Sequence, residues 1–246
     1  MPTVQVLESY QGIAKEEWDA LVGEGSPFLE HTFLAGLEAW GCAVPDTGWT
    51  PRPVLVRDDQ ERLVGAAPAW VKTHSMGEFV YDHSWAHAAE RAGISYYPKL
   101  VVGVPFSPVT GGRLLVAPGA DASKVRTALL AGLQAAVEGL NGLHVLFDTE
   151  EEAGWLAERG AFSRLQFQFH WTNRGYEDFE GFLKRFSSKK RNKIRRERKE
   201  LRGLRIEATV DPGAERLDIM HRFYVQHCRN FGPWGRVYLS RDFFQY

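Results

Sequence analysis

The chain has 246 residues, of which 44% are hydrophobic and 25% charged, and its 30 Lys and Arg stand against 31 Asp and Glu. This globular composition excludes a disordered acidic tail, a collagen-like fibre and a uniformly basic protein. The length suits one large domain or two of ordinary size.

Apolar spacing in the first part of the chain predicts a strand, two helices separated at Ser26-Pro27, and a β-hairpin that turns at residues 58–61. The expected elements are a strand at 4–7, helices around Trp18 and around Trp40, hairpin strands at 53–57 and 63–72, and further strands at 78–85 and 99–106.

A loop rich in proline and glycine is expected over residues 105–119. The apolar positions from Val125 to Leu140 fit a helix that Asp121 or Ser123 can cap. A strand at 143–147, a helix at 150–159 and an alternating strand at 165–171 follow. This order of elements predicts an α/β sandwich around a mixed sheet.

A second unit is expected to begin near residue 173. It comprises a helix carrying Phe179 to Phe186, a basic helix, a strand at 205–210, a turn at 211–213 and a helix at 214–230. Because this repeats the opening order of strand then helices, we expect a second copy of the first fold. The apolar helical turn at 243–246 carries no stop signal, so we expect the second copy to be incomplete and the chain to be a fragment of a longer protein.

Charge is concentrated in one segment. Residues 184–202 contain eleven Lys or Arg and two Glu, a net charge of +9, whereas the other 227 residues carry -10. Such a helix repels itself, which favours an anionic counterpart, namely a folded RNA or an anionic lipid headgroup. The alternative is a solvated helix balanced by the acidic body. The cations that we expect to bind the anion are Lys189, Lys190, Arg191, Lys193, Arg195 and Arg196.

Ionisable and aromatic groups gather in residues 72–85, directly after an apolar strand. His74, Glu78 and Asp82 are the candidates for acid–base catalysis in a cleft. The alternative is a polar loop packed under aromatic rings. Candidate substrate-binding residues, some of which hold anionic groups, are Lys72, Ser75, Trp85, Tyr97, Lys99, Arg113 and His170.

Other site classes receive little support. The sequence has no P-loop, G-x-G-x-x-G, G-x-S-x-G or H-E-x-x-H motif. His83 and His87 could share a helical face, but no third ligand is evident, so we expect no metal. Two distant cysteines, Cys42 and Cys228, favour a reducing compartment, and no stretch is apolar enough to cross a bilayer. We therefore expect a cytoplasmic protein, at most peripheral to the inner face of the membrane.

Several motifs, in order along the whole chain, resemble a family of bacterial predicted N-acyltransferases that is similar to the Fem aminoacyltransferases of peptidoglycan synthesis. The motifs are Ser26-Pro27-Phe28, residues 72–82, Tyr96-Tyr97-Pro98-Lys99-Leu100, residues 105–115, Gln168-Phe169-His170-Trp171 and residues 189–198.

The resemblance implies tandem GNAT-like domains, the first over residues 1–172 and the second, incomplete, over 173–246. It implies transfer of an acyl or aminoacyl group to an amine, possibly of a peptidoglycan precursor, with acyl-CoA or aminoacyl-tRNA as co-substrate and no tightly bound cofactor. A tRNA or a lipid-linked precursor would then be the partner of the basic helix. The acyl-CoA signature of GNAT enzymes is not recognisable at residues 107–113, so a non-catalytic module that recognises precursor or tRNA is the alternative.

Overall fold

A computed structural model describes residues 2–210, 212–232 and 235–245. The chain divides into two compact units, which are described separately. The first unit comprises Met1–Arg164 and Ala214–Tyr246, and the second comprises Leu165–Gly213.

The first unit contains two four-stranded sheets, ordered β1-β3-β4-β7 and β2-β5-β6-β8. All neighbouring strands are antiparallel except β6 and β8, which are parallel. The strands are β1 (Thr3–Val6), β2 (Trp49–Pro51), β3 (Val54–Arg57), β4 (Leu63–Ala67), β5 (Ala69–Lys72), β6 (Lys99–Val102), β7 (Leu115–Val116) and β8 (Leu143–Val145). The expected mixed α/β class is therefore confirmed.

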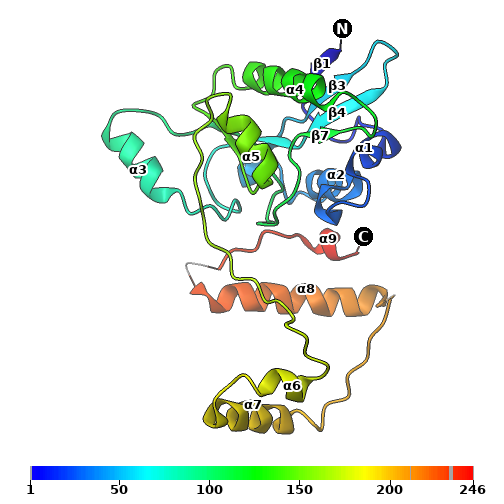
Figure 1. The fold of residues 1–246 in the computed structure, drawn as a ribbon, viewed down its shortest axis with the longest axis vertical. Coiled ribbons are helices and arrows are strands. Elements are labelled where there is room, and N and C mark those ends of the chain that lie inside the picture. Colours follow the sequence, from blue (N-terminus) through cyan, green and yellow to red (C-terminus); the bar gives the residue numbers. More distant parts are fainter. Residues whose placement is uncertain (1, 211, 233–234, 246) are drawn as a thin grey trace. The chain divides into compact units, whose positions relative to one another are not determined.

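Helices cover both faces of the first sheet, as alternate residues of β3 show. Leu55 packs in the apolar cluster that contains Trp18 of α1 (Lys15–Val22) and Leu34 of α2 (His31–Ala39). Val54 and Val56 pack in the other cluster, with Leu129 and Leu133 of α4 (Ala122–Ala136). Successive strand residues point to opposite faces of a sheet. The first sheet therefore lies between α4 on one face and α1 and α2 on the other, and α4 contacts β1 and β3 (Figure 1).

The remaining helices of the first unit follow the predicted order in part. They are η1 (Pro27–Leu29), η2 (Pro45–Thr47), α3 (His83–Arg91), α5 (Glu150–Ala157), α8 (Gly213–Asn230) and α9 (Arg241–Gln245). Asp121 caps α4 by accepting a hydrogen bond from the Lys124 backbone N–H, as one of the two expected caps. Among the described residues, no helix is both long and apolar enough to cross a membrane.

The second unit contains α6 (Phe179–Leu183) and α7 (Ser188–Glu200). Asp178 caps α6 and Ser187 caps α7, each through a side-chain oxygen that accepts a backbone N–H. The rings of Phe182 and Phe186 lie edge to face at 5.1 Å. The predicted basic helix is therefore confirmed as α7. The predicted helix that carries Phe179 to Phe186 forms as the shorter helix α6.

Four predicted strands differ from the structure: three do not form, and one is two separate strands. Residues 78–85 cannot extend as a strand because Phe79 and Tyr81 have positive φ angles of 60° and 50°, and α3 begins at His83 instead. The run 63–72 is two strands in different sheets, which meet at Pro68.

Residues 165–171 and 205–210 form no strand in the described part of the chain. Phe167 is 99% exposed and Ile206 is 91% exposed. Alternation shows only which side chains could share a buried face, because a strand also needs a hydrogen-bonded neighbour. Residues 173–246 thus contribute helices alone among the described residues, and the second GNAT-like copy and its boundary at residue 173 stay predictions. Asp211 of the predicted turn and Tyr246 of the predicted terminal turn lie outside the described residues.

Candidate active site

Trp49, Lys72 and Lys99 lie side by side at one end of the sheet β2-β5-β6-β8. Trp49 pairs with Lys72 across β2 and β5, and Lys72 pairs with Lys99 across β5 and β6. All three side chains are fully buried, and Lys72 Nζ lies 3.8 Å from the centre of the Trp49 ring. Because directly paired residues project to the same face, the register of the sheet brings two buried ammonium groups together.

The loop after β5 supplies the acids that surround these cations. Lys99 Nζ donates to Asp82 Oδ2 at 2.7 Å, to Glu78 Oε2 at 2.9 Å and to Ser75 Oγ at 3.2 Å. Glu78 and Asp82 are buried, as is the ammonium that they share. A buried charge needs such partners, so Lys99 is the centre of the cluster.

Two tyrosines complete the shell around Lys99. Tyr96 donates its phenol hydrogen to Asp82 Oδ2 at 2.7 Å, and the hydroxyls of Ser75 and Tyr97 are hydrogen-bonded at 2.6 Å. Lys99 Nζ lies 5.0 Å from the centre of the Tyr96 ring and 5.5 Å from that of Tyr97. The tyrosines thus hold Asp82 and Ser75 in place against the ammonium.

Lys72 and His74 both form hydrogen bonds with the backbone of Met76. Lys72 Nζ donates to the Met76 carbonyl at 3.2 Å, and His74 Nδ1 accepts from the Met76 N–H at 3.1 Å. Gly48 has a φ of +76°, and a Cβ there would lie 2.4 Å from His74 Nε2. Glycine is therefore required at position 48 for both the turn and the seat of the imidazole.

The pKa values of the Glu78 and Asp82 carboxyl groups are shifted in opposite directions. Burial raises the pKa of Glu78, although Lys99 opposes the shift. Burial would also raise the pKa of Asp82, but hydrogen bonds from Lys99, Ser75 and Tyr96 lower it to about 2. Environments that separate two neighbouring carboxyl pKa values in this way are typical of acid–base sites.

The basic groups of the cluster are shifted toward neutrality. Burial lowers the pKa of Lys72 to about 7, a shift that Glu78 opposes and Lys99 reinforces. Burial and the charge of Lys72 lower the pKa of His74. Both groups can therefore be deprotonated near neutral pH, as an acceptor of a proton must be.

One oxygen of each carboxyl remains available. Glu78 Oε1 and Asp82 Oδ1 are buried and have no hydrogen-bond partner among the described residues. The other oxygen of each group, Glu78 Oε2 and Asp82 Oδ2, accepts a hydrogen bond from Lys99 Nζ. Buried polar atoms are normally satisfied, so these two oxygens are the acceptors that the cluster can offer to a ligand or a water.

Strained backbone lies next to the cluster. Phe79, Tyr81 and Phe106 have φ angles of 60°, 50° and 61°. Such left-handed conformations cost roughly 1–2 kcal/mol each for residues with a Cβ and are concentrated at functional sites. The loop that carries Glu78 and the loop that follows β6 are therefore held by the fold in conformations that they would not adopt alone.

Six predicted site residues come together in this cluster, and His74 adjoins it. The six are Lys72, Ser75, Glu78, Asp82, Tyr97 and Lys99. Their assigned roles in catalysis and substrate binding stay predictions.

Arg113 is placed in a different environment from the cluster. It is buried, and its guanidinium donates to the carbonyl oxygens of Val109, Gly112 and Leu146, at 2.6, 3.1 and 2.8 Å respectively. Burial lowers the pKa of Arg113 to about 10. Glu152 accepts the backbone N–H groups of Arg113 and Leu114. These contacts fix the loop before β7, and anion binding by Arg113 stays a prediction without geometric support.

Trp85 and His170 lie outside the cluster as well. Trp85 is half-exposed on α3, where its ring lies 6.1 Å from that of Phe162. His170 belongs to the second unit and is exposed there.

The cations of α7 fall on two faces. Arg191 donates to the Phe186 carbonyl, Arg195 pairs with Glu180, and Arg198 stacks over Phe179 at 4.1 Å. The side chains of Lys189, Arg196 and Lys199 make no ion pair or ring contact with any described residue. Arg195 and Arg198 thus hold α7 to α6, and Arg191 holds it to the connection between the two helices. Lys189, Arg196 and Lys199 form what we call the open face of the helix. Lys190 lies over the Phe186 ring and Lys193 pairs with Glu197.

Three members of the site were not predicted: Trp49, Tyr96 and His144. Trp49 and Lys72 are 23 positions apart, and only the pairing of β2 with β5 joins them. Tyr96 stands beside the predicted Tyr97, which is a signal that could have been used. Burial and the charge of Lys99 lower the pKa of His144 to about 4, so this imidazole, 5.7 Å from the Tyr96 ring, is neutral.

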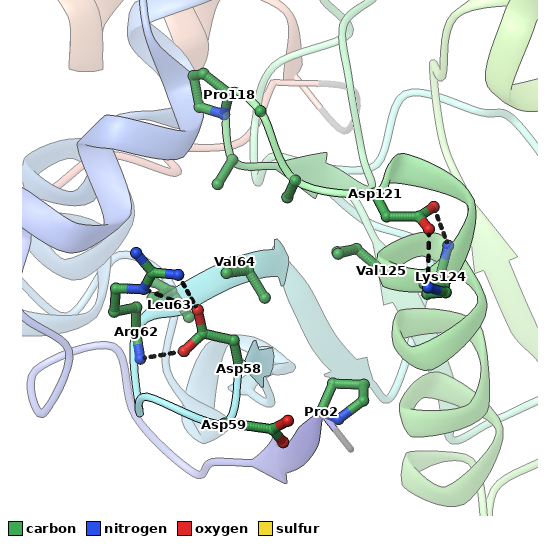
Figure 2. A pocket seen from close by; sticks show the side chains of 13 residues that line it. Pro2, Asp58, Asp59, Arg62, Leu63, Val64, Pro118, Asp121, Lys124 and Val125 are labelled. Atoms are coloured by element: carbon green, nitrogen blue, oxygen red, sulfur yellow. Dashed lines mark hydrogen bonds and ion pairs between the residues drawn. The ribbon is translucent and has the colours of Figure 1, made fainter.

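An open hollow of about 500 Å³ lies elsewhere, between the β3–β4 turn and the loop before α4 (Figure 2). Its charged side chains pair within their own elements, Asp58 with Arg62 and Asp121 with Lys124. Because these pairs are exposed, they offer a ligand little that water does not. The buried cluster is the better candidate for chemistry.

In the described part of the chain, no three His, Cys, Asp or Glu side chains lie close enough together to hold a metal ion. His83 and His87 are both exposed on α3.

Comparisons with known proteins give one family and several weak structural likenesses. A family model described as FemAB-like, peptidoglycan biosynthesis/recognition, matches residues 9–246. No curated protein matches the chain.

Similar solved structures include a GNAT-family acetyltransferase of Streptococcus pneumoniae, with 16% identity and a TM-score of 0.36 over 71% of this chain and 99% of that one. An aminoglycoside 6'-N-acetyltransferase of Acinetobacter baumannii has 10% identity and a TM-score of 0.40 over 71% and 100% of the two chains. Glucosamine-6-phosphate N-acetyltransferase of Arabidopsis thaliana has 9% identity and a TM-score of 0.38 over 70% and 99%. At this level of similarity, none of their residues is carried over to this chain.

The family match extends over nearly the whole sequence and includes every residue of the buried cluster. The resemblance found in the sequence motifs is therefore confirmed, and the chain belongs to the FemAB-like family of peptidoglycan biosynthesis/recognition proteins.

Proposed function

We propose that the chain is an N-acyltransferase whose active site is the cluster around Lys99. The observation that carries the proposal is the pair of buried carboxyl groups with separated pKa values, each of which presents one oxygen without a partner among the described residues. Such an arrangement can accept a hydrogen from an amine and later hold the proton that the amine releases.

The proposed reaction is direct attack of a neutral amine on the carbonyl carbon of an ester or thioester. The new bond joins nitrogen to the acyl carbon, the bond from that carbon to oxygen or sulfur breaks, and the alcohol or thiol leaves. The proton lost by the amine passes to Glu78, with His74 as the other candidate acceptor, and from there to the departing oxygen or sulfur, which leaves as the neutral alcohol or thiol. Asp82 stays ionised and holds Lys99, so that the ammonium remains fixed next to Glu78.

Acyl-CoA or aminoacyl-tRNA is the proposed donor, and the amine of a peptidoglycan precursor is the proposed acceptor. Family membership supports a role in peptidoglycan metabolism. We place the reaction in the cytoplasm, at the inner face of the membrane if the acceptor is lipid-linked. Incubation of the protein with labelled acetyl-CoA or labelled aminoacyl-tRNA and with precursor amines should give a labelled amide, and Glu78→Gln should reduce its formation at least tenfold. Transfer by none of these pairs would contradict the proposal.

A second candidate function, recognition without catalysis, is favoured by the open face of α7. Three cations there have no partner among the described residues, whereas the other face of the helix is held to α6. A polyanion such as tRNA would bind these cations by releasing counterions, with a steep dependence on salt.

This candidate is tested by fluorescence anisotropy with labelled tRNA between 50 and 200 mM KCl. Replacing Lys189, Arg196 and Lys199 by Gln should lower the slope of log K against log salt by about 2–3, because each phosphate contact contributes nearly one unit. The exposed cations Lys15 and Lys124 lie in the first unit, and their replacement by Gln provides the control. A shallow slope for the unmodified protein would contradict RNA recognition.

A further inference from the structure

An arm of the first unit, residues 235–240, lies against the loops of the candidate site. Tyr224 on α8 holds it, because the Tyr224 phenol oxygen accepts the backbone N–H groups of Tyr238 at 2.8 Å and Leu239 at 3.2 Å. Cys42 holds its far end, where the Ser240 N–H donates to Sγ at 3.2 Å. The arm is thus anchored at Tyr238 and at the two residues that follow it.

The ring of Tyr238 contacts two phenylalanines of the site. It stacks on Phe106, with the ring centres 4.9 Å apart and an angle of 22° between the planes. It meets Phe79 edge to face, at 6.2 Å and 77°. One side chain therefore joins the loop after β5 to the loop after β6.

Both of these phenylalanines have a strained backbone. Phe79 has a φ of 60° and Phe106 a φ of 61°, in the left-handed region that residues with a Cβ avoid. A strained conformation persists only where surrounding contacts favour it over its relaxed alternatives. The Tyr238 ring supplies such a contact to both residues at once.

The strained loops are also tied to each other and to the cluster. The Phe106 N–H donates to the Gly77 carbonyl at 3.1 Å, and the Phe106 ring lies 5.6 Å from that of Trp49. Gly77 immediately precedes Glu78, so the bond to Phe106 reaches the residue next to this carboxyl group. Relaxation of Phe79 or Phe106 would therefore move the carboxyl group that we assign as the proton acceptor.

We infer that Tyr238 is a positioning residue of the active site, which acts through Phe79 and Phe106 to hold the loops that carry Glu78. The inference rests on the proposed function only where it calls these loops an active site. The experiment below uses no substrate, so its failure would leave transfer activity open, and a failure to find transfer would leave its result standing.

The test is amide hydrogen exchange of the full chain, with Tyr238→Leu, Tyr238→Phe and the control Phe223→Leu, which removes an exposed ring from α8. Tyr238→Leu should speed exchange of peptides covering 76–82 and 104–107 about tenfold, because two aromatic contacts of this kind together change an opening equilibrium by roughly that factor. Tyr238→Phe keeps the ring and should stay within about threefold of the unmodified protein. Phe223→Leu should leave both peptides unchanged.

A second readout follows the indole N–H resonance of Trp49 in ¹⁵N-tryptophan-labelled protein. It should shift in Tyr238→Leu and return in Tyr238→Phe, which loss of overall stability alone would not produce. If Tyr238→Leu unfolds the whole unit, Tyr224→Phe is decisive, because it removes only the oxygen that anchors the arm and should raise exchange in the same two peptides. Unchanged exchange at 76–82 and 104–107 in these variants overturns the inference.

Discussion

Replacement of Lys99 by Met removes the ammonium that the two buried carboxyl groups share. Lys99 is fully buried, and so are both ion pairs that it makes. Loss of one partner from a buried pair leaves an uncompensated charge and costs about 3–5 kcal/mol. We therefore expect the free energy of unfolding of Lys99→Met to fall by about that amount at pH 8.

The cost should shrink in acid, because the carboxyl groups can escape by taking up protons. From their ordinary pKa values, protonation at pH 5 costs about 1.5 kcal/mol for Asp82 and about 1 kcal/mol for Glu78, so the loss is limited to roughly 2.5 kcal/mol. At pH 8 the same escape costs about 10 kcal/mol and limits nothing.

The sign follows from proton linkage. In the unmodified protein the pKa of Asp82 is lowered to about 2, so its ionisation stabilises the fold above pH 4 and the contribution is lost as the pH falls toward 2. In Lys99→Met the carboxyl pKa values lie above their ordinary range, so stability falls as the pH rises from 4. The difference between variant and unmodified protein should therefore grow by about 0.5–2.5 kcal/mol from pH 5 to pH 8.

Urea unfolding followed by far-ultraviolet circular dichroism at the two pH values measures this difference. Lys15→Met is the matched control, because Lys15 pairs with Asp19 at the surface of α1 and its loss should leave stability nearly unchanged at both pH values. A loss below about 1 kcal/mol at pH 8, or an equal loss at both pH values, would refute the reasoning from buried charge.

Two other predictions concern the same cluster. The pKa of Lys72 is about 7 in the fold and about 10.4 in the unfolded chain, so the free energy of unfolding should rise between pH 7 and pH 10. Lys72→Met should abolish that rise in urea titrations. A Lys72 amine that is still protonated at pH 10 by ¹³Cε NMR would contradict burial as the cause. Gly77→Ala should be at least about 2 kcal/mol more destabilising than Gly93→Ala in the same titrations. Both glycines have a positive φ, but only a Cβ at Gly77 would meet a neighbour, the Phe106 ring at 2.8 Å. Equal losses would show that the ring moves aside.

Local sequence patterns predicted most elements of the first unit because their causes are local. Asp121 satisfies an N–H of its own helix, and the apolar positions of α4 face a sheet whatever that sheet's order is. The strand at 78–85 failed for a non-local reason, since the left-handed conformation of Phe79 is accompanied by a ring contact with the distant Tyr238, which no window of sequence contains.

The site was predictable to the extent that it lies on one segment. Ser75, Glu78 and Asp82 come from a single loop, and their grouping of ionisable side chains is visible in the sequence. Their arrangement around Lys99 depends on the pairing of β5 with β6, and the contact of Lys72 with Trp49 depends on the pairing of β2 with β5. These registers are set by the packing of whole strands, so the sequence could indicate the candidates but not which amine would be the centre.

The two concentrations of charge in this chain have different physical consequences. On α7 the cations are exposed, so each is screened by water and salt, and the helix can act only on a partner that brings many negative charges. Around Lys99 four charges are buried within hydrogen-bond or cross-strand distance, where each alters the protonation of the others. Net charge sums these cases as if they were alike, although only the buried group can change its protonation near neutral pH. The chemistry of this chain is therefore expected at the cluster that contributes almost nothing to the overall balance.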